Sequence, residues 1–168
     1  MFKKEEVWKL IGIDLGTTFS SIARWTGEEA ETYSPKGERM VRSVVYYDEK
    51  NNKYIFGNTA FMSGILNPEN VIVGVKRLMD DKNAKIKLGS KIHNPIEISS
   101  MILKNLYNNV KSMFPSGVYE ASGVVVTVPY YFKAHQFQNT SEAAKMAGLK
   151  LLGIIQEPIM DFTIQTNT

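Results

Sequence analysis

The chain of 168 residues contains no cysteine and only two histidines. The absence of cysteine excludes disulfides, thiolate metal sites and cysteine nucleophiles, and it is compatible with a reducing compartment. Long hydrophobic runs are also missing, because no stretch approaches the ~20 apolar residues of a membrane span. The charged N-terminal sequence MFKKEE lacks the apolar core of a signal peptide. We therefore expect a cytoplasmic protein that binds no membrane.

A large excess of one charge is absent as well. The chain has 20 Lys and Arg against 17 Asp and Glu, a net charge of +3. Nucleic-acid-binding proteins need a basic stripe to neutralise phosphates, so we expect no nucleic-acid partner. Only Lys82, Lys85, Lys87 and Lys91 cluster, and their polar setting predicts a solvated loop. With 43% hydrophobic residues, the composition indicates one ordinary globular domain.

The hydrophobic pattern predicts one mixed sheet with helices on its faces. Short apolar runs separated by turn residues predict the strands, which are residues 10–15, 20–25, 30–33, 43–47, 53–56, 123–128 and 151–156. Apolar residues at three- and four-residue steps predict the helices, which are residues 59–66, 68–79, 95–114 and 134–147. The first three strands form an antiparallel meander, and residues 123–156 form a right-handed strand–helix–strand unit. Asn94 and Glu97 suit a capping box before the longest helix.

The first strand ends in a pattern that suits phosphate chemistry. Asp14 is followed after one residue by Gly16, Thr17 and Thr18. A glycine lets the backbone approach a phosphate, and successive N–H groups can converge on it as donors. The carboxylate of Asp14 can hold a hydrated Mg²⁺ that bridges to the phosphates. An ordinary hairpin turn with a capping aspartate explains the same residues.

Other polar residues have two interpretations each. Lys76 follows the apolar residues 71–75 and either projects toward a phosphate or is an exposed helical cation. Glu157 follows a buried strand, where α/β sheets place ligands, but a strand that ends in Glu-Pro is also ordinary. His93 and His135 lack metal-site spacing, and we expect loop and helix-surface roles. The aromatic residues 130–132 are expected to pack internally.

Taken in order, several short motifs resemble one family. They are Asp14-Leu15-Gly16-Thr17-Thr18, Lys76-Arg77-Leu78, Val126-Thr127-Val128-Pro129 followed after one residue by Tyr131-Phe132, and Glu157-Pro158. The chain resembles the amino-terminal part of the ATPase domain of DnaK-like (seventy-kilodalton heat-shock) chaperones, from about residue 10 to residue 158. The first motif alone also occurs in sugar kinases and actin relatives, whereas the ordered set is specific to the chaperones.

The resemblance implies an α/β fold, an actin-like (ribonuclease H-like) ATPase lobe with a mixed five-stranded-type sheet flanked by helices and a small α+β insertion. The chain would be a single lobe. Its base would combine residues 7–40 and 118–168, and residues 41–117 would form the inserted flanking subdomain.

The resemblance also implies the site and its cofactors, ATP or ADP and Mg²⁺. Asp14 and Glu157 would hold Mg²⁺ through water, and Lys76 would position the water that attacks the γ-phosphate. Gly16, Thr17 and Thr18 would cradle the phosphates. Such a set suits phosphoryl transfer, which depends on positioning and charge neutralisation.

Some positions depart from the family pattern, so the chain is identified as a divergent member. Lys133 and Ala134 replace the usual Asn-Asp, which removes a helix cap worth ~1 kcal/mol. Phe137 replaces the arginine of the relay to the peptide-binding domain, whereas its proline partner is matched by Pro129. Arg42 stands where the family usually has proline.

We predict the first lobe of the ATP-binding and ATP-hydrolysing domain of such a chaperone, which couples ATP turnover to protein folding in the stress response. The expected partners are the missing second lobe and peptide-binding domain of the same protein, unfolded clients, co-chaperones and a nucleotide-exchange factor. Because the sequence stops before the second phosphate loop, we expect this fragment to be inactive alone and able to self-associate. The alternatives are a non-hydrolysing interaction module and a sugar-kinase-like lobe.

Overall fold

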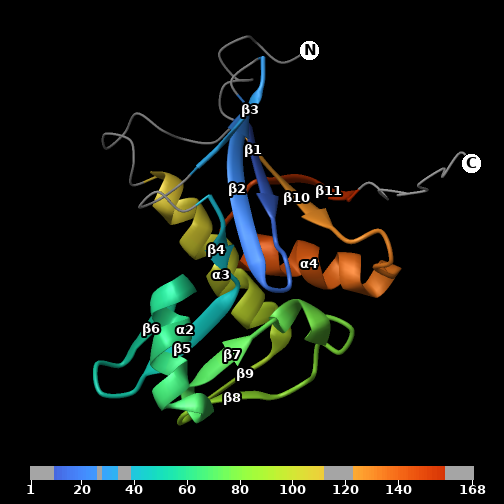
Figure 1. Cartoon of the computed structure of the whole chain (residues 1–168). Helices are drawn as coiled ribbons and strands as arrows, with labels where there is room; N and C mark the ends of the chain where they lie inside the picture. The colour runs from blue at the N-terminus through green and yellow to red at the C-terminus, as the bar shows by residue number, and fades with distance from the viewer. Residues whose placement is uncertain (1–9, 26–27, 34–38, 112–122, 158–168) are drawn as a thin grey trace, which may run out of the picture.

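The larger sheet forms the upper half of the molecule (Figure 1). The computed structural model describes residues 10–25, 28–33, 39–111 and 123–157. Five strands follow the order β11-β10-β1-β2-β3, and a short strand, β4, pairs with β2. These strands are β1 (Leu10–Asp14), β2 (Phe19–Trp25), β3 (Ala30–Thr32), β4 (Val41–Arg42), β10 (Gly123–Val128) and β11 (Leu151–Gln156). β1, β10 and β11 run parallel, whereas β1, β2 and β3 are antiparallel. The predicted mixed sheet is therefore present.

A smaller α+β unit lies below the large sheet in Figure 1. Its three-stranded sheet has the order β6-β5-β7, and a separate hairpin pairs β8 with β9. Helix α2 (Gly57–Leu66) packs against this sheet. The strands are β5 (Val44–Asp48), β6 (Lys53–Phe56), β7 (Val71–Val73), β8 (Ile86–Leu88) and β9 (Lys91–His93). This unit falls within the predicted insertion, but the division of the chain into subdomains stays a prediction, and its boundaries at residues 7 and 118 lie outside the described residues.

Helices α3 (Pro95–Lys111) and α4 (Ala134–Met146) pack against each other and against the large sheet. The apolar side chains of α3 recur at three- and four-residue steps, and Ile98, Ile102, Leu106 and Val110 are buried. This spacing places them on one face of the helix, as its periodicity predicts. The predicted end of this helix at residue 114 lies outside the described residues.

One hydrophobic core joins the two sheets. It contains Ile11 and Val126 from the large sheet, Val45 from the small sheet, and Leu103 from α3. Because a buried cluster of this kind excludes water from both units at once, each unit stabilises the other.

The predicted helix over residues 68–79 is wrong. The segment forms a 3₁₀ turn, η2 (Pro68–Asn70), then β7, then a second 3₁₀ turn, η3 (Val75–Leu78). Its β-branched residues favour extended backbone, and β7 pairs with β5. Gly74 has a φ of 68°, a left-handed conformation that breaks any continuous helix.

The lysine-rich segment after Asp81 is a loop only in part: Lys82 and Lys85 lie in irregular backbone, whereas Lys87 and Lys91 belong to the β8–β9 hairpin. In β8, Ile86 and Leu88 are buried while Lys87 between them is exposed. This alternation anchors the hairpin through its apolar side chains and leaves the lysines in water.

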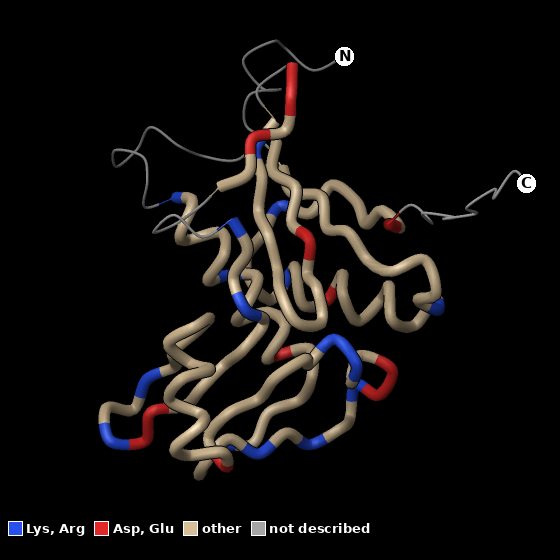
Figure 2. Tube along the Cα trace, viewed as in Figure 1, with Lys and Arg blue, Asp and Glu red and all other residues tan. Residues whose placement is uncertain are grey.

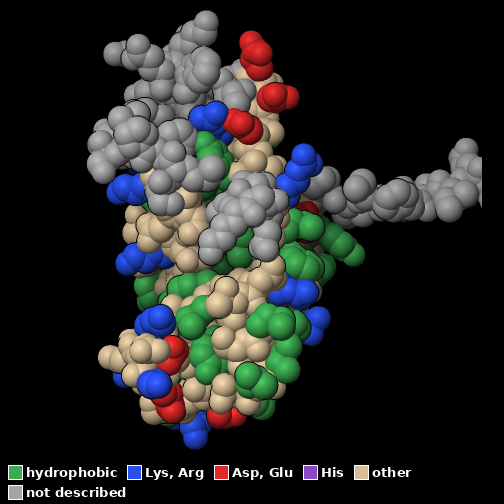
Figure 3. Space-filling model, turned by 60° about the vertical axis from the view of Figure 1, so that its left-hand side comes forward, with side chains coloured by type: hydrophobic (Ala, Val, Ile, Leu, Met, Phe, Trp, Pro, Cys, Tyr) green, Lys and Arg blue, Asp and Glu red, His purple; other side chains and the backbone are tan. Residues whose placement is uncertain are grey.

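Charged residues of both signs are distributed along the trace (Figure 2). The face in Figure 3 shows hydrophobic side chains between charged ones, and α2 exposes Met62, Ile65 and Leu66. Tyr130 and Tyr131 are also exposed, which corrects the prediction that they pack internally, whereas Phe132 is buried. In the described parts of the chain, no helix has the length and apolar character needed to cross a membrane.

Candidate functional site

Lys76 lies in η3 with only 4% of its surface exposed. Its Nζ atom is 3.3 Å from Oε1 of Glu157 and 5.6 Å from the centroid of the Phe132 ring. A buried ammonium group needs a charged or polar partner, and Glu157 supplies one. The side chain is therefore not an exposed helical cation.

Glu157 directly follows β11, at the end of the described chain. Its backbone N–H donates a hydrogen bond to the carbonyl oxygen of Val128 at 2.7 Å, which extends the pairing with β10 by one residue. The Glu157 side chain is 42% exposed. Glu157 thus has one oxygen near Lys76 while much of its side chain remains open to solvent or a ligand.

Asp14 is the last residue of β1, at the same edge of the sheet. It lies opposite Thr127 of β10, and the Thr127 hydroxyl donates a hydrogen bond to Oδ1 of Asp14 at 3.2 Å. Because β1, β10 and β11 are parallel, their carboxyl ends meet at one edge, where open α/β sheets bind ligands. Sequence analysis did not identify Thr127 as a neighbour of the site. The available signal was a polar residue between two buried valines, Val126 and Val128, at the end of a strand.

Burial and the neighbouring charges shift the pKa values of Asp14 and Lys76. Burial raises the pKa of Asp14; the positive charge of Lys76 opposes this rise and the negative charge of Glu157 adds to it. Burial lowers the pKa of Lys76, against the attraction of Glu157 and Asp14. The site therefore holds one carboxylate, Asp14, and one amine, Lys76, in poorly solvated surroundings beside the more exposed carboxylate of Glu157. Such perturbed groups are common at functional sites.

The donor set fits Mg²⁺. Asp14 and Glu157 present carboxylate oxygens, which this ion prefers, and their mutual repulsion leaves negative charge for a cation to neutralise. Among the described residues, no cluster of three or more His, Cys, Asp or Glu side chains forms a complete metal cage. Mg²⁺ usually keeps several waters and binds through one or two carboxylates together with phosphates.

The predicted phosphate loop connects β1 to β2. Gly16 has no room for a side chain, because an added Cβ atom would collide with the carbonyl group of Phe19. Thr17 is half-buried and Thr18 is exposed. The turn therefore requires glycine at residue 16, and it brings its backbone to the edge that carries Asp14.

Three of the residues that depart from the family pattern, Lys133, Ala134 and Phe137, lie at the start of α4, whereas the fourth, Arg42, lies in β4. Pro129 is buried after β10, and Phe137 packs beside Met79 and Phe132 in a small apolar cluster. The Lys133 N–H donates a hydrogen bond to the Gln136 side chain at 2.9 Å. Part of the helix cap predicted to be lost is thus supplied by Gln136, three residues later, as in a capping box.

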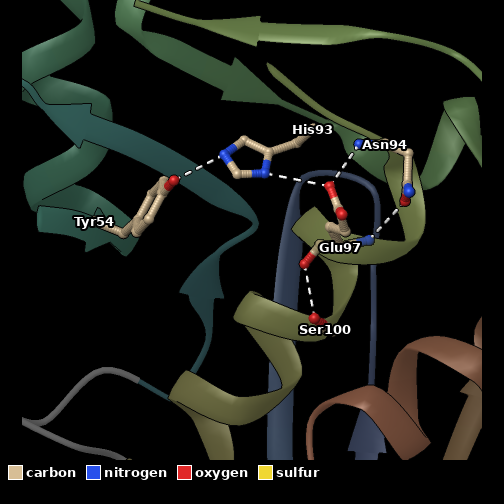
Figure 4. A network of polar contacts seen from close by, with 5 residues as sticks. All are labelled: Tyr54, His93, Asn94, Glu97 and Ser100. Carbon is tan, nitrogen blue, oxygen red and sulfur yellow. Dashed lines mark hydrogen bonds and ion pairs between the residues drawn. The ribbon is translucent and has the colours of Figure 1, made fainter. Parts of the chain in front are cut away.

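A second polar cluster belongs to the smaller unit (Figure 4). His93 Nε2 lies 2.8 Å from the Tyr54 hydroxyl, and its Nδ1 lies 3.3 Å from Oε2 of Glu97. Glu97 and Asn94 form the predicted capping box of α3. His93 therefore joins β6, β9 and α3 instead of occupying a loop.

The other histidine and the cavity lie apart from Lys76. His135, exposed on α4 as predicted, contacts Asp80 at 2.6 Å. A cavity of about 390 Å³ is lined by β6, the start of α2, Asn105 and Asn109, and none of the predicted site residues lines it.

The chain matches a known family over most of its length. The model of the Hsp70 protein family matches residues 10–93 and 80–160. The matched segments include Asp14, Lys76 and Glu157, and also Pro129. Members of this family are chaperones whose nucleotide-binding domain has the actin-like ATPase fold and binds ATP or ADP with Mg²⁺. The protein therefore belongs to the Hsp70 family.

Proposed function

We propose that this chain forms one lobe of a nucleotide-binding domain that hydrolyses ATP within a chaperone. The observation that carries the proposal is the buried Lys76 amine, 3.3 Å from Glu157 and close enough to Asp14 for each to shift the other's pKa. Burial of the Lys76 ammonium group beside two carboxylates is costly, and a phosphate–metal ligand would complete the charge balance of the three groups.

Each side chain has a distinct role in this proposal. The backbone N–H groups of Gly16, Thr17 and Thr18 bind phosphate oxygens. Asp14 and Glu157 hold Mg²⁺ through water, and the bound ion neutralises phosphate charge. Lys76 orients the attacking water and places positive charge beside the γ-phosphate, so that charge developing during transfer meets a preorganised partner.

In this proposal the site is one side of a nucleotide-binding cleft, and a second protein surface must cover the bound nucleotide. Glu157 is 42% exposed, so solvent reaches the carboxylate that would face the nucleotide. In our proposal a second lobe of the same protein holds the adenosine and excludes water. Pro129, buried beside the site strands, would transmit the nucleotide state toward a peptide-binding domain that grips unfolded clients.

The proposal also includes the proteins that act with members of this family. Hsp70 proteins act with client proteins and co-chaperones, and we propose the same for this protein, together with a nucleotide-exchange factor, in the cytoplasm and in the stress response. Phe137 packs in an apolar cluster, so its contribution to interdomain coupling would come from packing and not from a charged contact.

Single-turnover ATP hydrolysis by the intact protein tests the proposal. We expect Lys76→Ala to slow the chemical step by about 100-fold or more, the usual effect of removing one electrostatic stabiliser of the transition state, with ATP affinity changed much less. Lys145→Ala, which removes an exposed lysine of α4, is the matched control and should hydrolyse ATP at the wild-type rate. A rate unchanged by Lys76→Ala would remove Lys76 from the mechanism.

The apolar packing of Phe137 favours a second candidate, a non-hydrolysing module that keeps the fold for protein contacts. It predicts that wild-type protein binds nucleotide without turnover. Measured single-turnover hydrolysis by wild type would exclude this candidate.

A further inference from the structure

Ser43 connects the two segments that carry the proposed phosphate chemistry. It lies between β4 and β5, and only 1% of its surface is exposed. Its neighbours on one side are Gly16 and Thr18 of the phosphate loop, and on the other side is Gly74, which begins the Lys76 turn. No family motif identified in the sequence includes this serine.

Two hydrogen bonds from Ser43 fix the phosphate loop. Its hydroxyl donates to the Gly16 carbonyl oxygen at 2.7 Å, and its backbone N–H donates to the Thr18 carbonyl oxygen at 2.9 Å. In a trans peptide the carbonyl and the following N–H point in opposite directions. Holding the Gly16 carbonyl toward Ser43 therefore turns the Thr17 N–H away from Ser43, which leaves that donor available to a ligand.

The Ser43 hydroxyl is itself held in place. Ser20 Oγ lies 2.8 Å from Ser43 Oγ. A hydroxyl has one hydrogen to donate, and that of Ser43 is directed to Gly16, so Ser20 acts as the donor in this contact. Both hydroxyls are buried, which makes their orientation more defined than that of a solvated serine.

Ser43 also contacts the segment before Lys76. Its carbonyl oxygen accepts a hydrogen bond from the Gly74 N–H at 3.4 Å. Gly74 has a φ of 68°, and an added Cβ atom there would lie 3.4 Å from the Thr17 side chain. The Lys76 turn and the phosphate loop are thus neighbours that share one hydrogen-bonding residue.

We propose that Ser43 is a positioning residue that orients the Thr17 N–H toward bound phosphate and keeps the loop in register with the Lys76 turn. This inference rests on the proposed function. In Ser43→Ala the backbone bonds remain, but the Gly16 carbonyl loses its hydroxyl donor. The Gly16–Thr17 peptide can then rotate, so phosphate-dependent affinity falls while adenosine affinity does not.

Binding of MgADP and of adenosine to the intact protein tests this role. We expect Ser43→Ala to raise the Kd for MgADP by about tenfold and to leave the Kd for adenosine unchanged. The matched control is Ser100→Ala, which removes another buried serine hydroxyl that donates to a backbone carbonyl, at 2.8 Å, on α3. Ser100→Ala should leave the ratio of the two Kd values at its wild-type value.

A second variant keeps the test informative if Ser43→Ala fails to fold. Ser43→Cys retains a weaker donor of similar shape, and its loss of MgADP affinity should be smaller than that of Ser43→Ala, about two- to fivefold. If wild type binds MgADP but the Ser43 variants keep the wild-type ratio of Kd values, the role of Ser43 is overturned while the proposed function stands. If wild type binds no MgADP, both are overturned.

Discussion

At the scale of single residues, the site is defined by charges that burial disfavours. Lys76 is 4% exposed and Asp14 is partly buried. Burial raises the pKa of Asp14 and lowers the pKa of Lys76, which favours the neutral form of each group. Such groups lower stability unless a partner compensates. Their presence at one edge of the sheet is consistent with a site selected for binding at some expense of stability.

Asp14→Asn should therefore stabilise the nucleotide-free protein at neutral pH, by about 1 kcal/mol. Burial raises the folded-state pKa of Asp14 above the ordinary aspartate value of 3.8. The carboxyl therefore favours folding below pH 3.8, and that contribution is lost as the pH rises through the folded-state pKa. Asparagine can still accept the Thr127 hydrogen bond. Urea unfolding at pH 7 and at pH 3.5 measures the difference, which should shrink at the lower pH.

The control for this prediction is Asp81→Asn, which removes an exposed carboxylate. It should change the free energy of unfolding by less than about 0.5 kcal/mol. If Asp14→Asn proves less stable than wild type at pH 7, Asp14 is stabilised by its neighbours and the account of its burial is wrong.

Sequence analysis placed Asp14 and Glu157 at strand ends because hydrophobic runs end there. It could not predict their contacts, since the Lys76–Glu157 pair joins residues 81 positions apart. Ser43 was missed for a similar reason: its role depends on three backbone groups that are brought together only by folding, and a serine beside a short strand has no local signal of its own.

At the scale of secondary structure, local sequence patterns predicted an element correctly where its apolar residues had one clear spacing, either helical or extended. Helix α3 combines a regular apolar face with a capping box, so both its start and its buried side were predictable. Residues 68–79 carry an apolar run that is compatible with either helix or strand. The pairing of β7 with β5 and the left-handed backbone of Gly74 make the segment a strand between two turns. The strand pairing is a tertiary contact, which a local pattern does not contain.

Asn94→Ala should destabilise the protein by about 1 kcal/mol, because Asn94 Oδ1 accepts the Glu97 N–H at the first turn of α3. Asn108→Ala, at an exposed position in the same helix, should be neutral or slightly stabilising. Thermal or urea unfolding compares the two variants. Equal stabilities would show that the cap contributes nothing measurable.

At the scale of the whole molecule, one core spans both sheets. Ile11 of β1 and Val45 of β5 belong to the same buried cluster, and Leu103 of α3 is fully buried in it. Although the family resemblance predicts two subdomains, shared burial predicts that they unfold together.

Amide hydrogen exchange under native conditions tests this cooperativity. Leu103→Ala should lower the opening free energy of β1 and of β5 by the same amount, about 2–5 kcal/mol. Ile92→Ala, at a position 66% exposed, should alter neither strand substantially. A loss of protection confined to one sheet would mean that the two units unfold separately.

The convergence of Asp14 and Glu157 on a metal-bound phosphate is tested most directly by calorimetric titration of the intact protein with ADP, with and without Mg²⁺. Mg²⁺ should tighten ADP binding to wild type by at least about tenfold, a difference of 1.4 kcal/mol. In Asp14→Asn and Glu157→Gln this enhancement should largely disappear, while metal-free binding stays near the wild-type value. An enhancement that both variants retain in full would contradict the assignment of these carboxylates to the metal–nucleotide site.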